Sequence, residues 1–237
     1  MAAAAAPVAR RVDGVRVEHE PEAVLASVRA MLAELRRQGA PAALGLACQR
    51  STCLVWERAT GRPLTPAISW QDRREAGRVR GMAAHAEEVA RRTGLRLSPH
   101  YAAPKLAGLL EALPDGLARA RGGELVAGTL DAWLVRRLAG RDATEPGQAG
   151  RTLLYDLEED RWSPELCALW GVPAAALPAL APSAGAWGEV EGVPLRAMLG
   201  DQQAALLGHG GWAEGTAAAH FGTGAFVLAT TGGAVRR

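Results

Sequence analysis

Short apolar runs alternate with stretches of helical periodicity along this chain, and that alternation restricts the fold more than any other feature. A first helix is predicted over residues 22–38, where Val24, Val28 and Met31 recur at helical spacing and Gly39 follows as a stop. Strands are predicted over residues 42–48, 52–57, 124–127 and 195–199, and further helices over residues 129–138 and 202–209. The pattern predicts an α/β fold with a central sheet covered by helices.

The two ends of the chain lack elements that such a fold would have. Strands over residues 216–221 and 225–230 are predicted to pair as a hairpin, and the sequence stops at Arg237 without a closing helix. No strand is predicted before the first helix, and residues 1–13 are expected to be disordered or frayed. We therefore expect both ends to be cut.

The charge balance and the cysteine pattern exclude several classes of protein. The 27 basic and 25 acidic residues nearly cancel, and no basic stripe for nucleic acid occurs. No apolar run approaches the ~20 residues that cross a bilayer. Cys48, Cys53 and Cys167 form no CxxC pair, which argues against a zinc site or disulfide framework and predicts a cytoplasmic protein. We predict no protein-held metal, and a homo-oligomer is left open.

Polar side chains follow three of the predicted strands at the point where each strand ends. These clusters are Gln49-Arg50-Ser51, Trp70-Gln71-Asp72 and Asp201-Gln202-Gln203. Because ligands of open α/β sheets gather at the carboxyl ends of strands, the clusters together predict a binding site. Each also has a structural interpretation: Arg50 as a surface charge, Trp70 as packing, and Asp201 as a helix N-cap. For Asp201 taken alone the capping interpretation is favoured.

Two features are compatible with phosphate binding, but each has a simpler explanation. The segment Gly222-Thr223-Gly224 could present backbone N–H groups to a phosphate, although a tight hairpin turn explains it better. Lys105 is the only lysine, and biased codon composition explains this better than a phosphate-binding ammonium does. The chain contains neither the GxxxxGK[ST] phosphate loop nor a GxGxxG fingerprint that opens a βαβ unit.

Six segments resemble motifs of the FGGY carbohydrate kinases, in the family's order, and the glycerol kinase branch in particular. They are residues 48–56, 68–74, 128–134, 150–155, 200–206 and 221–226, and residues 17–21 are similar to a further family motif. Together they extend from about Gly14 to the end of the chain. Each segment alone is a weak signal, and their order makes the resemblance specific.

The resemblance implies an actin-like (ribonuclease H-like) ATPase fold. This chain would hold the N-terminal, substrate-binding lobe without its first strands over residues 14–212, and the first hairpin of the C-terminal, ATP-binding lobe over residues 213–237. Family members transfer the γ-phosphoryl group of ATP, with Mg²⁺, to a hydroxyl of a polyol or sugar. The catalytic base implied is Asp201. The implied substrate-binding residues are Arg50, Ser51, Trp70, His100, Tyr101, Gln202 and Phe226, and the implied phosphate-path residues are Gly222, Thr223 and Gly224.

The sequence departs from the glycerol kinase pattern at two places. Ser51 stands where glycerol kinases typically carry Glu, and His100, next to Tyr101, stands where they typically carry Tyr. A changed set of hydrogen-bonding groups changes the hydroxyl pattern that can be satisfied, so we expect a polyol or sugar that need not be glycerol. We expect the family's first strand and phosphate-binding turn, whose Asp binds Mg²⁺, to lie before Met1, and most of its ATP-binding lobe to lie beyond Arg237.

We therefore expect this chain alone to have weak or no kinase activity. Two alternatives stay open. The first is a non-catalytic remnant of a kinase that binds a polyol or a protein partner. The second is a plain α/β domain in which Asp201 only caps a helix.

Overall fold

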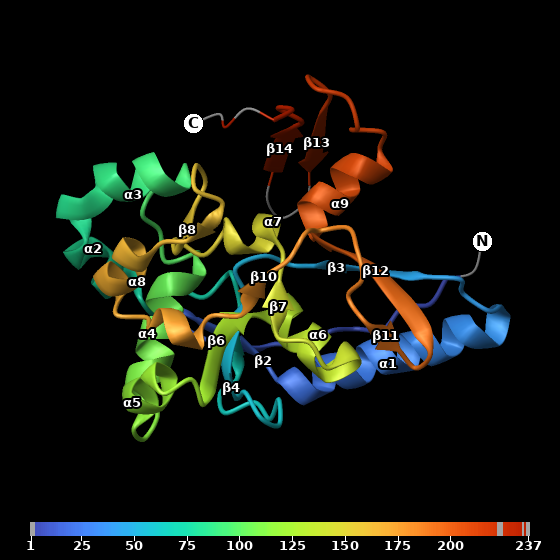
Figure 1. Cartoon of the computed structure of the whole chain (residues 1–237), viewed down its shortest axis with the longest axis horizontal. Coiled ribbons are helices and arrows are strands. Elements are labelled where there is room, and N and C mark those ends of the chain that lie inside the picture. The colour runs from blue at the N-terminus through green and yellow to red at the C-terminus, as the bar shows by residue number, and fades with distance from the viewer. Residues whose placement is uncertain (1–2, 222–224, 234, 236–237) are drawn as a thin grey trace.

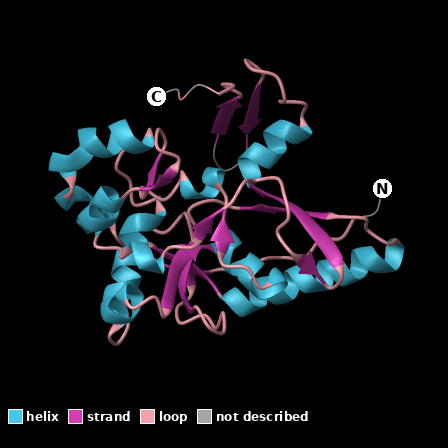
Figure 2. Ribbon diagram, viewed as in Figure 1, coloured by secondary structure: helices cyan, strands magenta, loops and turns pink. Residues whose placement is uncertain are grey.

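The computed structural model describes residues 3–221, 225–233 and 235. Its largest sheet has five strands, and each neighbouring pair in it is antiparallel (Figures 1 and 2). In spatial order these strands are β1 (Arg11–Asp13), β2 (Arg16–His19), β5 (Ala67–Ile68), β4 (Cys53–Glu57) and β6 (Leu125–Thr129). Strands β4 and β6, at one edge of this sheet, are buried on both faces, because helices cover them from both sides.

A second sheet of three strands brings the site together. Its order is β11 (Glu189–Val190), β12 (Val193–Gly200) and β3 (Leu44–Cys48). Strands β12 and β3 run parallel, and their last residues, Gly200 and Cys48, lie opposite each other. The residues that follow both strands therefore emerge at the same edge of this sheet.

Three apolar clusters form the core. The longest helix, α1 (Pro21–Gln38), buries Val24, Leu25 and Leu32 and begins with a proline, whose missing N–H costs nothing in the first turn. Together with α6 (Leu130–Ala139), α1 packs on β3, β4 and β12. On the other side, α4 (Ala102–Ala112) and α5 (Gly116–Arg121) cover β4 and β6.

The remaining elements are short. Three two-stranded sheets are formed by β7 (Ala143–Thr144) with β10 (Ala179–Leu180), β8 (Tyr155–Asp156) with β9 (Arg161–Trp162), and β13 (Ala217–Phe221) with β14 (Ala225–Ala229). The short helices are α2 (Ala76–Gly81), α3 (Ala86–Thr93), α7 (Pro146–Ala149), α8 (Pro164–Trp170) and α9 (Asp201–Gly208), with 3₁₀ turns at Ala83–His85 and Ala174–Ala176. Among the described residues, no helix is both long enough and apolar enough to cross a membrane.

The predicted α/β class, the long first helix and the hairpin near the end of the chain are confirmed. Two expectations are wrong. Strands β1 and β2 precede the first helix and pair through a turn at Gly14, so residues 11–13 of the segment expected to be frayed belong to a sheet. The predicted single central sheet is divided into separate hydrogen-bonded sheets. The sequence missed β1 because its three residues are all exposed and carry no apolar periodicity.

Candidate active site

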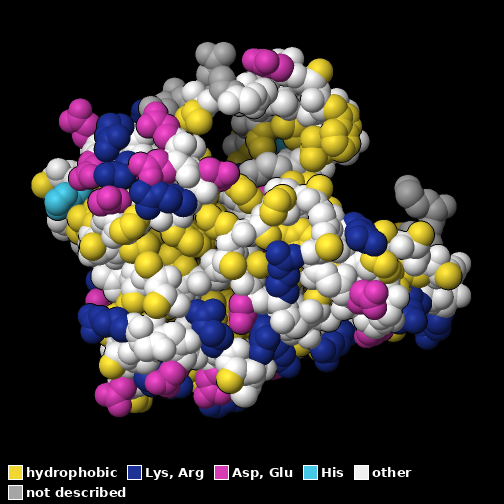
Figure 3. Space-filling model, viewed as in Figure 1, with side chains coloured by type: hydrophobic (Ala, Val, Ile, Leu, Met, Phe, Trp, Pro, Cys, Tyr) yellow, Lys and Arg dark blue, Asp and Glu magenta, His cyan; other side chains and the backbone are white. Residues whose placement is uncertain are grey.

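The polar clusters that follow β3, β5 and β12 converge on one small cavity. Its volume is about 80 Å³, and it is lined by Gln49, Arg50, Trp70, His100, Arg151, Asp201, Gln202 and Phe226. The space-filling view shows the surface hollowed between the part of the molecule that carries α9, β13 and β14 and the rest of the chain (Figure 3). The parallel pairing of β3 with β12 explains the convergence, because it places Arg50 and Asp201 beside each other.

Asp201 is the first residue of α9, and Gly200 occupies the N-cap position. The Asp201 carboxylate accepts a hydrogen bond from the adjacent Gln202 amide, at 2.9 Å, through Oδ1. The same oxygen lies 3.9 Å from Nε of Arg50, which is an ion-pair distance but too long for a hydrogen bond. The carboxylate is about half exposed at the cavity, so it can accept a hydrogen bond from a bound hydroxyl.

Arg50 lies against the backbone at the start of α9. Its side chain is 13% exposed, and burial lowers the pKa of its guanidinium, as does the charge of Arg151, while Asp201 acts in the opposite direction. A Cβ on Gly200 would lie 2.6 Å from Cδ of Arg50 and 2.5 Å from Oε1 of Gln203. Glycine is therefore required at position 200 for Arg50 to reach the cavity in this conformation.

Aromatic rings form one wall of the cavity. The rings of Trp70 and His100 lie 5.5 Å apart, and Tyr101 packs edge-on against His100 at 5.1 Å. Burial, together with the charges of Lys105, Arg151 and Arg50, lowers the pKa of His100 to about 4. The imidazole is therefore neutral near pH 7, where one ring nitrogen donates a hydrogen bond and the other accepts one.

Two buried polar atoms of cavity residues have no protein partner within the part of the chain that the structure describes. They are Oε1 of Gln202, an acceptor, and Nε of Arg151, a donor. A buried polar atom without a partner costs about 1–3 kcal/mol, so such atoms mark positions where a ligand can supply the missing bond. A hydroxyl group can satisfy either atom, because it both donates and accepts.

Comparison with known proteins shows the family to which the chain belongs. The profile of the FGGY family of carbohydrate kinases, N-terminal domain, matches residues 5–208. The chain belongs to this family. It is 47% identical to the glycerol kinase of Thermus brockianus, over 91% of this chain and 47% of that protein. It is 44% identical to the glycerol kinase of Aromatoleum aromaticum, over 92% of this chain and 47% of that protein.

Solved structures of FGGY kinases share the fold. The crystal structure of Plasmodium falciparum glycerol kinase with ADP superposes with a TM-score of 0.86 at 25% identity, covering 93% of this chain and 47% of that one. The xylulose kinase from Rhodospirillum rubrum gives 0.85 at 20% identity, covering 94% and 49%, which supports the fold alone. The predicted actin-like kinase fold is thus confirmed, and the chain spans about half the length of the curated relatives it matches.

The cavity includes most of the side chains that the sequence singled out. Asp201, Arg50, Trp70, His100, Gln202 and Phe226 all line the cavity. Ser51 does not, because it is fully buried and its hydroxyl donates to the carbonyl of Arg151 at 3.1 Å. Tyr101 does not line the cavity either, but its ring packs against His100. The guanidinium of Arg151 lies over the Tyr101 ring at 4.9 Å. The segment Gly222-Thr223-Gly224 lies outside the described residues.

Gln49 and Arg151 also line the cavity. Gln49 belongs to one of the three polar clusters predicted to form a binding site, but the resemblance gave it no role, and Arg151 was not predicted as a site residue. Arg151 lies in one of the six family-like segments, and that was the only signal for it. Its carbonyl bonds Ser51 and its guanidinium stacks on Tyr101, two contacts that depend on the tertiary fold.

The phosphate-binding interpretation of Lys105 is wrong. Its side chain is fully buried, and its ammonium donates to the carbonyl oxygens of Ser51 at 2.8 Å, Ser69 at 3.1 Å and His100 at 2.9 Å. An ammonium has three N–H donors, so these bonds use all of them and leave none for a phosphate. Biased codon composition, which concerns the absence of other lysines, stays a prediction.

The described residues include no group of three or more His, Cys, Asp or Glu side chains that could hold a metal ion. Because Mg²⁺ in phosphoryl transfer is usually held by one or two carboxylates together with substrate phosphates, the Mg²⁺ that the resemblance implies stays a prediction.

Proposed function

We propose that this chain binds a polyol or sugar in the cavity and presents one of its hydroxyls to Asp201 for phosphorylation by ATP. The observation that carries the proposal is the convergence of Arg50, Trp70 and Asp201, from three separate segments of the chain, on one small cavity. Family membership supports the reaction class. The ADP in the solved Plasmodium falciparum glycerol kinase supports ATP as the phosphoryl donor.

In the proposed reaction Asp201 is the general base. Its carboxylate takes the hydroxyl proton as the alcohol oxygen bonds to the γ-phosphorus, and the bond from that phosphorus to the β–γ bridging oxygen breaks with its electron pair leaving on ADP. Arg50 and Gln202 would hold neighbouring hydroxyls, since a guanidinium donates and an amide does both. Trp70 and Phe226 would pack on the carbon chain.

The proposed substrate is a small polyol. The cavity of about 80 Å³ is well below the roughly 300–1,000 Å³ typical of ligand pockets. Glycerol belongs to the candidates because the relatives above are named glycerol kinases. The predicted contribution of Ser51 would have to come through its backbone, because its hydroxyl is bound to Arg151.

Calorimetric titration with glycerol, four- and five-carbon polyols and ketopentoses tests this proposal. We expect one class to bind, and Arg50→Met to abolish the binding. Arg58→Met is the matched control, because Arg58 lines a different hollow and bonds the carbonyls of Gly123 and Ala175. The proposal fails if none of the compounds binds, or if both variants lose binding equally.

We also propose that the chain alone transfers phosphoryl groups weakly or not at all, because it spans about half the length of the glycerol kinases it matches. The same observation favours the second candidate, a polyol-binding module without catalysis. A titration with ATP and Mg²⁺ distinguishes the two: nucleotide binding by this chain excludes the non-catalytic module. We further propose a cytoplasmic location, supported by Cys48, Cys53 and Cys167, which are free and buried.

A further inference from the structure

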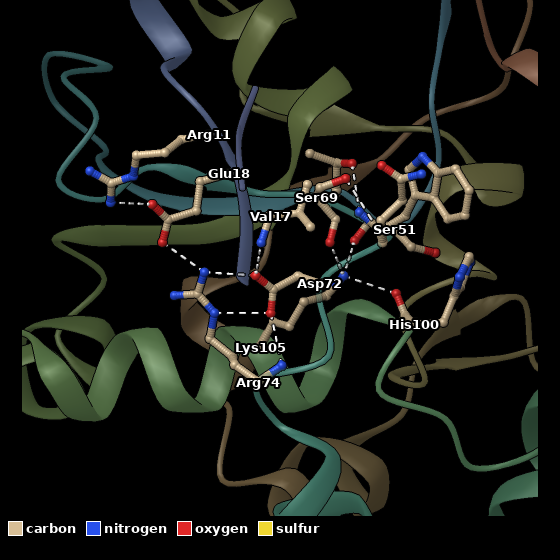
Figure 4. Close-up of polar contacts among 12 residues, drawn as sticks. Arg11, Val17, Glu18, Ser51, Ser69, Asp72, Arg74, His100 and Lys105 are labelled. Carbon is tan, nitrogen blue, oxygen red and sulfur yellow. Dashed lines mark hydrogen bonds and ion pairs between the residues drawn. The ribbon is translucent and has the colours of Figure 1, made fainter. Parts of the chain in front are cut away.

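The three carbonyls bound by the Lys105 ammonium belong to the loops that carry the substrate-facing side chains. Ser51 follows Arg50, Ser69 precedes Trp70, and the third carbonyl is that of His100 itself. Figure 4 shows the ammonium between these loops. Two of the loops follow β3 and β5, the third precedes α4, and the Lys105 ammonium bonds all three. Pairs of these loops also contact each other, through the Trp70 amide bonded to the Thr52 hydroxyl at 3.2 Å and through the rings of Trp70 and His100.

One of these loops is held in a conformation that needs support. Ser51 has a φ of 65°, in the left-handed region that residues other than glycine rarely adopt. Such a backbone costs of order 1–3 kcal/mol and persists only where the surroundings fix it. Here the fixing contacts are the bond from Lys105 to the Ser51 carbonyl and the bond from the Ser51 hydroxyl to Arg151.

We propose that Lys105 is a positioning residue for the polyol site, whose ammonium holds the loops of Arg50, Trp70 and His100 in the arrangement that binds substrate. It does not touch the cavity and acts only through these three loops. The inference rests on the proposed function of the cavity, but its structural part can be tested separately.

We call the Lys105 ammonium and the three carbonyls that it binds the clamp. The groups around the ammonium predict how the clamp responds to pH. Burial lowers the pKa of Lys105 to about 8, and the charged and titratable groups that face it are Cys53 from β4, Asp72 and Arg74 from the segment after β5, and His100. The pKa of Cys53 is raised to about 11 by burial, and that of His100 is about 4. Between pH 6 and 10, therefore, Lys105 is the member of this group that changes charge.

A neutral amine has two N–H donors and a lone pair, so it cannot satisfy three carbonyls. Deprotonation should release one loop, and affinity for the polyol should fall above about pH 8.

Hydrogen exchange of Lys105→Met tests the clamp without any ligand. We expect exchange to accelerate about tenfold or more in the three segments 49–52, 69–72 and 98–101 together, because bonds to a charged donor are lost. The matched control is Leu109→Ala, one turn further along α4, which loosens core packing but leaves the ammonium in place. The clamp is refuted if the two variants change exchange in these segments equally.

Polyol titration then tests the role in binding. Lys105→Met should weaken binding at least tenfold, whereas Leu109→Ala should leave the affinity of the folded protein nearly unchanged. If the wild type binds no polyol, the proposed function fails, while the exchange result still decides the clamp.

A measurement on the wild type covers the case in which Lys105→Met does not fold. Because Lys105 is the only lysine, ¹⁵N-lysine labelling gives a single side-chain NMR signal whose titration reports its pKa directly. Polyol affinity should fall with the same midpoint, near pH 8. An affinity that stays constant while the Lys105 signal titrates overturns the proposal.

Discussion

At the scale of single residues, the position of Asp201 bears on the choice between a general base and a helix cap. Gly200 holds the N-cap position of α9, and Asp201 is the first helical residue, whose carboxylate accepts a hydrogen bond from the second helical amide, that of Gln202. Asp201 therefore does not occupy the N-cap position that the capping interpretation gave it, and its half-exposed carboxylate lines the cavity.

We predict that Asp201→Asn lowers phosphoryl transfer by roughly 10²–10⁴-fold, the usual contribution of a general base. The free energy of unfolding should change by about 0.5 kcal/mol or less. Product formation would be measured in a version of the chain joined to the remaining half of the Thermus brockianus relative. Asp115→Asn, at an exposed left-handed position away from the cavity, is the control. Equal rates in the two variants would contradict the assignment.

Lys105 supplies a second prediction, because its titration should affect stability and binding in opposite directions. Its pKa falls from an ordinary 10.5 to about 8 in the folded chain. Between these values the unfolded chain binds the proton and the folded chain does not, so the free energy of unfolding rises with pH. By pH 9 this term should reach about 1 kcal/mol.

The measurement is urea unfolding at pH 7 to 9, taken as the difference between the wild type and Lys105→Met. The difference removes the opposite effect of buried thiols such as Cys167, whose pKa is raised to about 11 by burial. A difference that does not depend on pH would contradict the low pKa of Lys105.

At the scale of elements, the junction between β12 and α9 determines the shape of the site. The parallel pairing of β12 with β3 aligns Gly200 with Cys48, and the next residues on each chain segment face the cavity. The aliphatic part of Arg50 occupies the space that a side chain at position 200 would need.

We predict that Gly200→Ala displaces Arg50 and lowers polyol affinity, with a loss of about 1–3 kcal/mol of stability from overpacking. Gly171→Ala is the comparison, because a Cβ there meets no atom within 4 Å although its φ is positive. Calorimetry and thermal unfolding of both variants check this. If both lose stability but neither loses affinity, the close approach of Arg50 has no role in binding.

At the scale of the whole molecule, a buried ion network joins the N-terminal hairpin to the loop behind the site. Arg74 bonds Asp72 at 2.7 and 3.0 Å and Glu18 of β2 at 2.7 Å, while Asp72 also accepts from the Val17 amide at 2.6 Å (Figure 4). Burial would raise the pKa of both carboxyls, but the bonds from Arg74 outweigh it and hold both values below their ordinary range.

We predict that Arg74→Met destabilises the chain by about 3–5 kcal/mol, because Asp72 stays buried without its partner. The two lowered pKa values contribute stability above about pH 4 that is lost as the pH falls through the folded values. The wild type should therefore lose stability in acid more steeply than the variant. Urea unfolding from pH 7 to 3 measures this, and parallel curves would show that the network contributes nothing.

Much of the fold was predictable because helices and buried strands carry their own periodicity. Residues 22–38 were identified as a helix, and the structure places α1 at Pro21–Gln38. The hairpin β1–β2 was missed, since it is short and mostly exposed. Most of the cavity side chains were predicted, because a residue that directly follows a strand necessarily lies at a sheet edge.

The sequence by itself determined the fold class, the positions of the long helices and the side chains that directly follow the strands of the site. Only the tertiary structure decided that Ser51 turns away from the cavity, that Arg151 reaches it, and that Lys105 binds three loops at once. The physical reason is the separation along the sequence between the residues that make these contacts. Periodicity records which face of an element is buried, whereas the contacts of Lys105 with Ser51 and Ser69 join residues 54 and 36 positions apart.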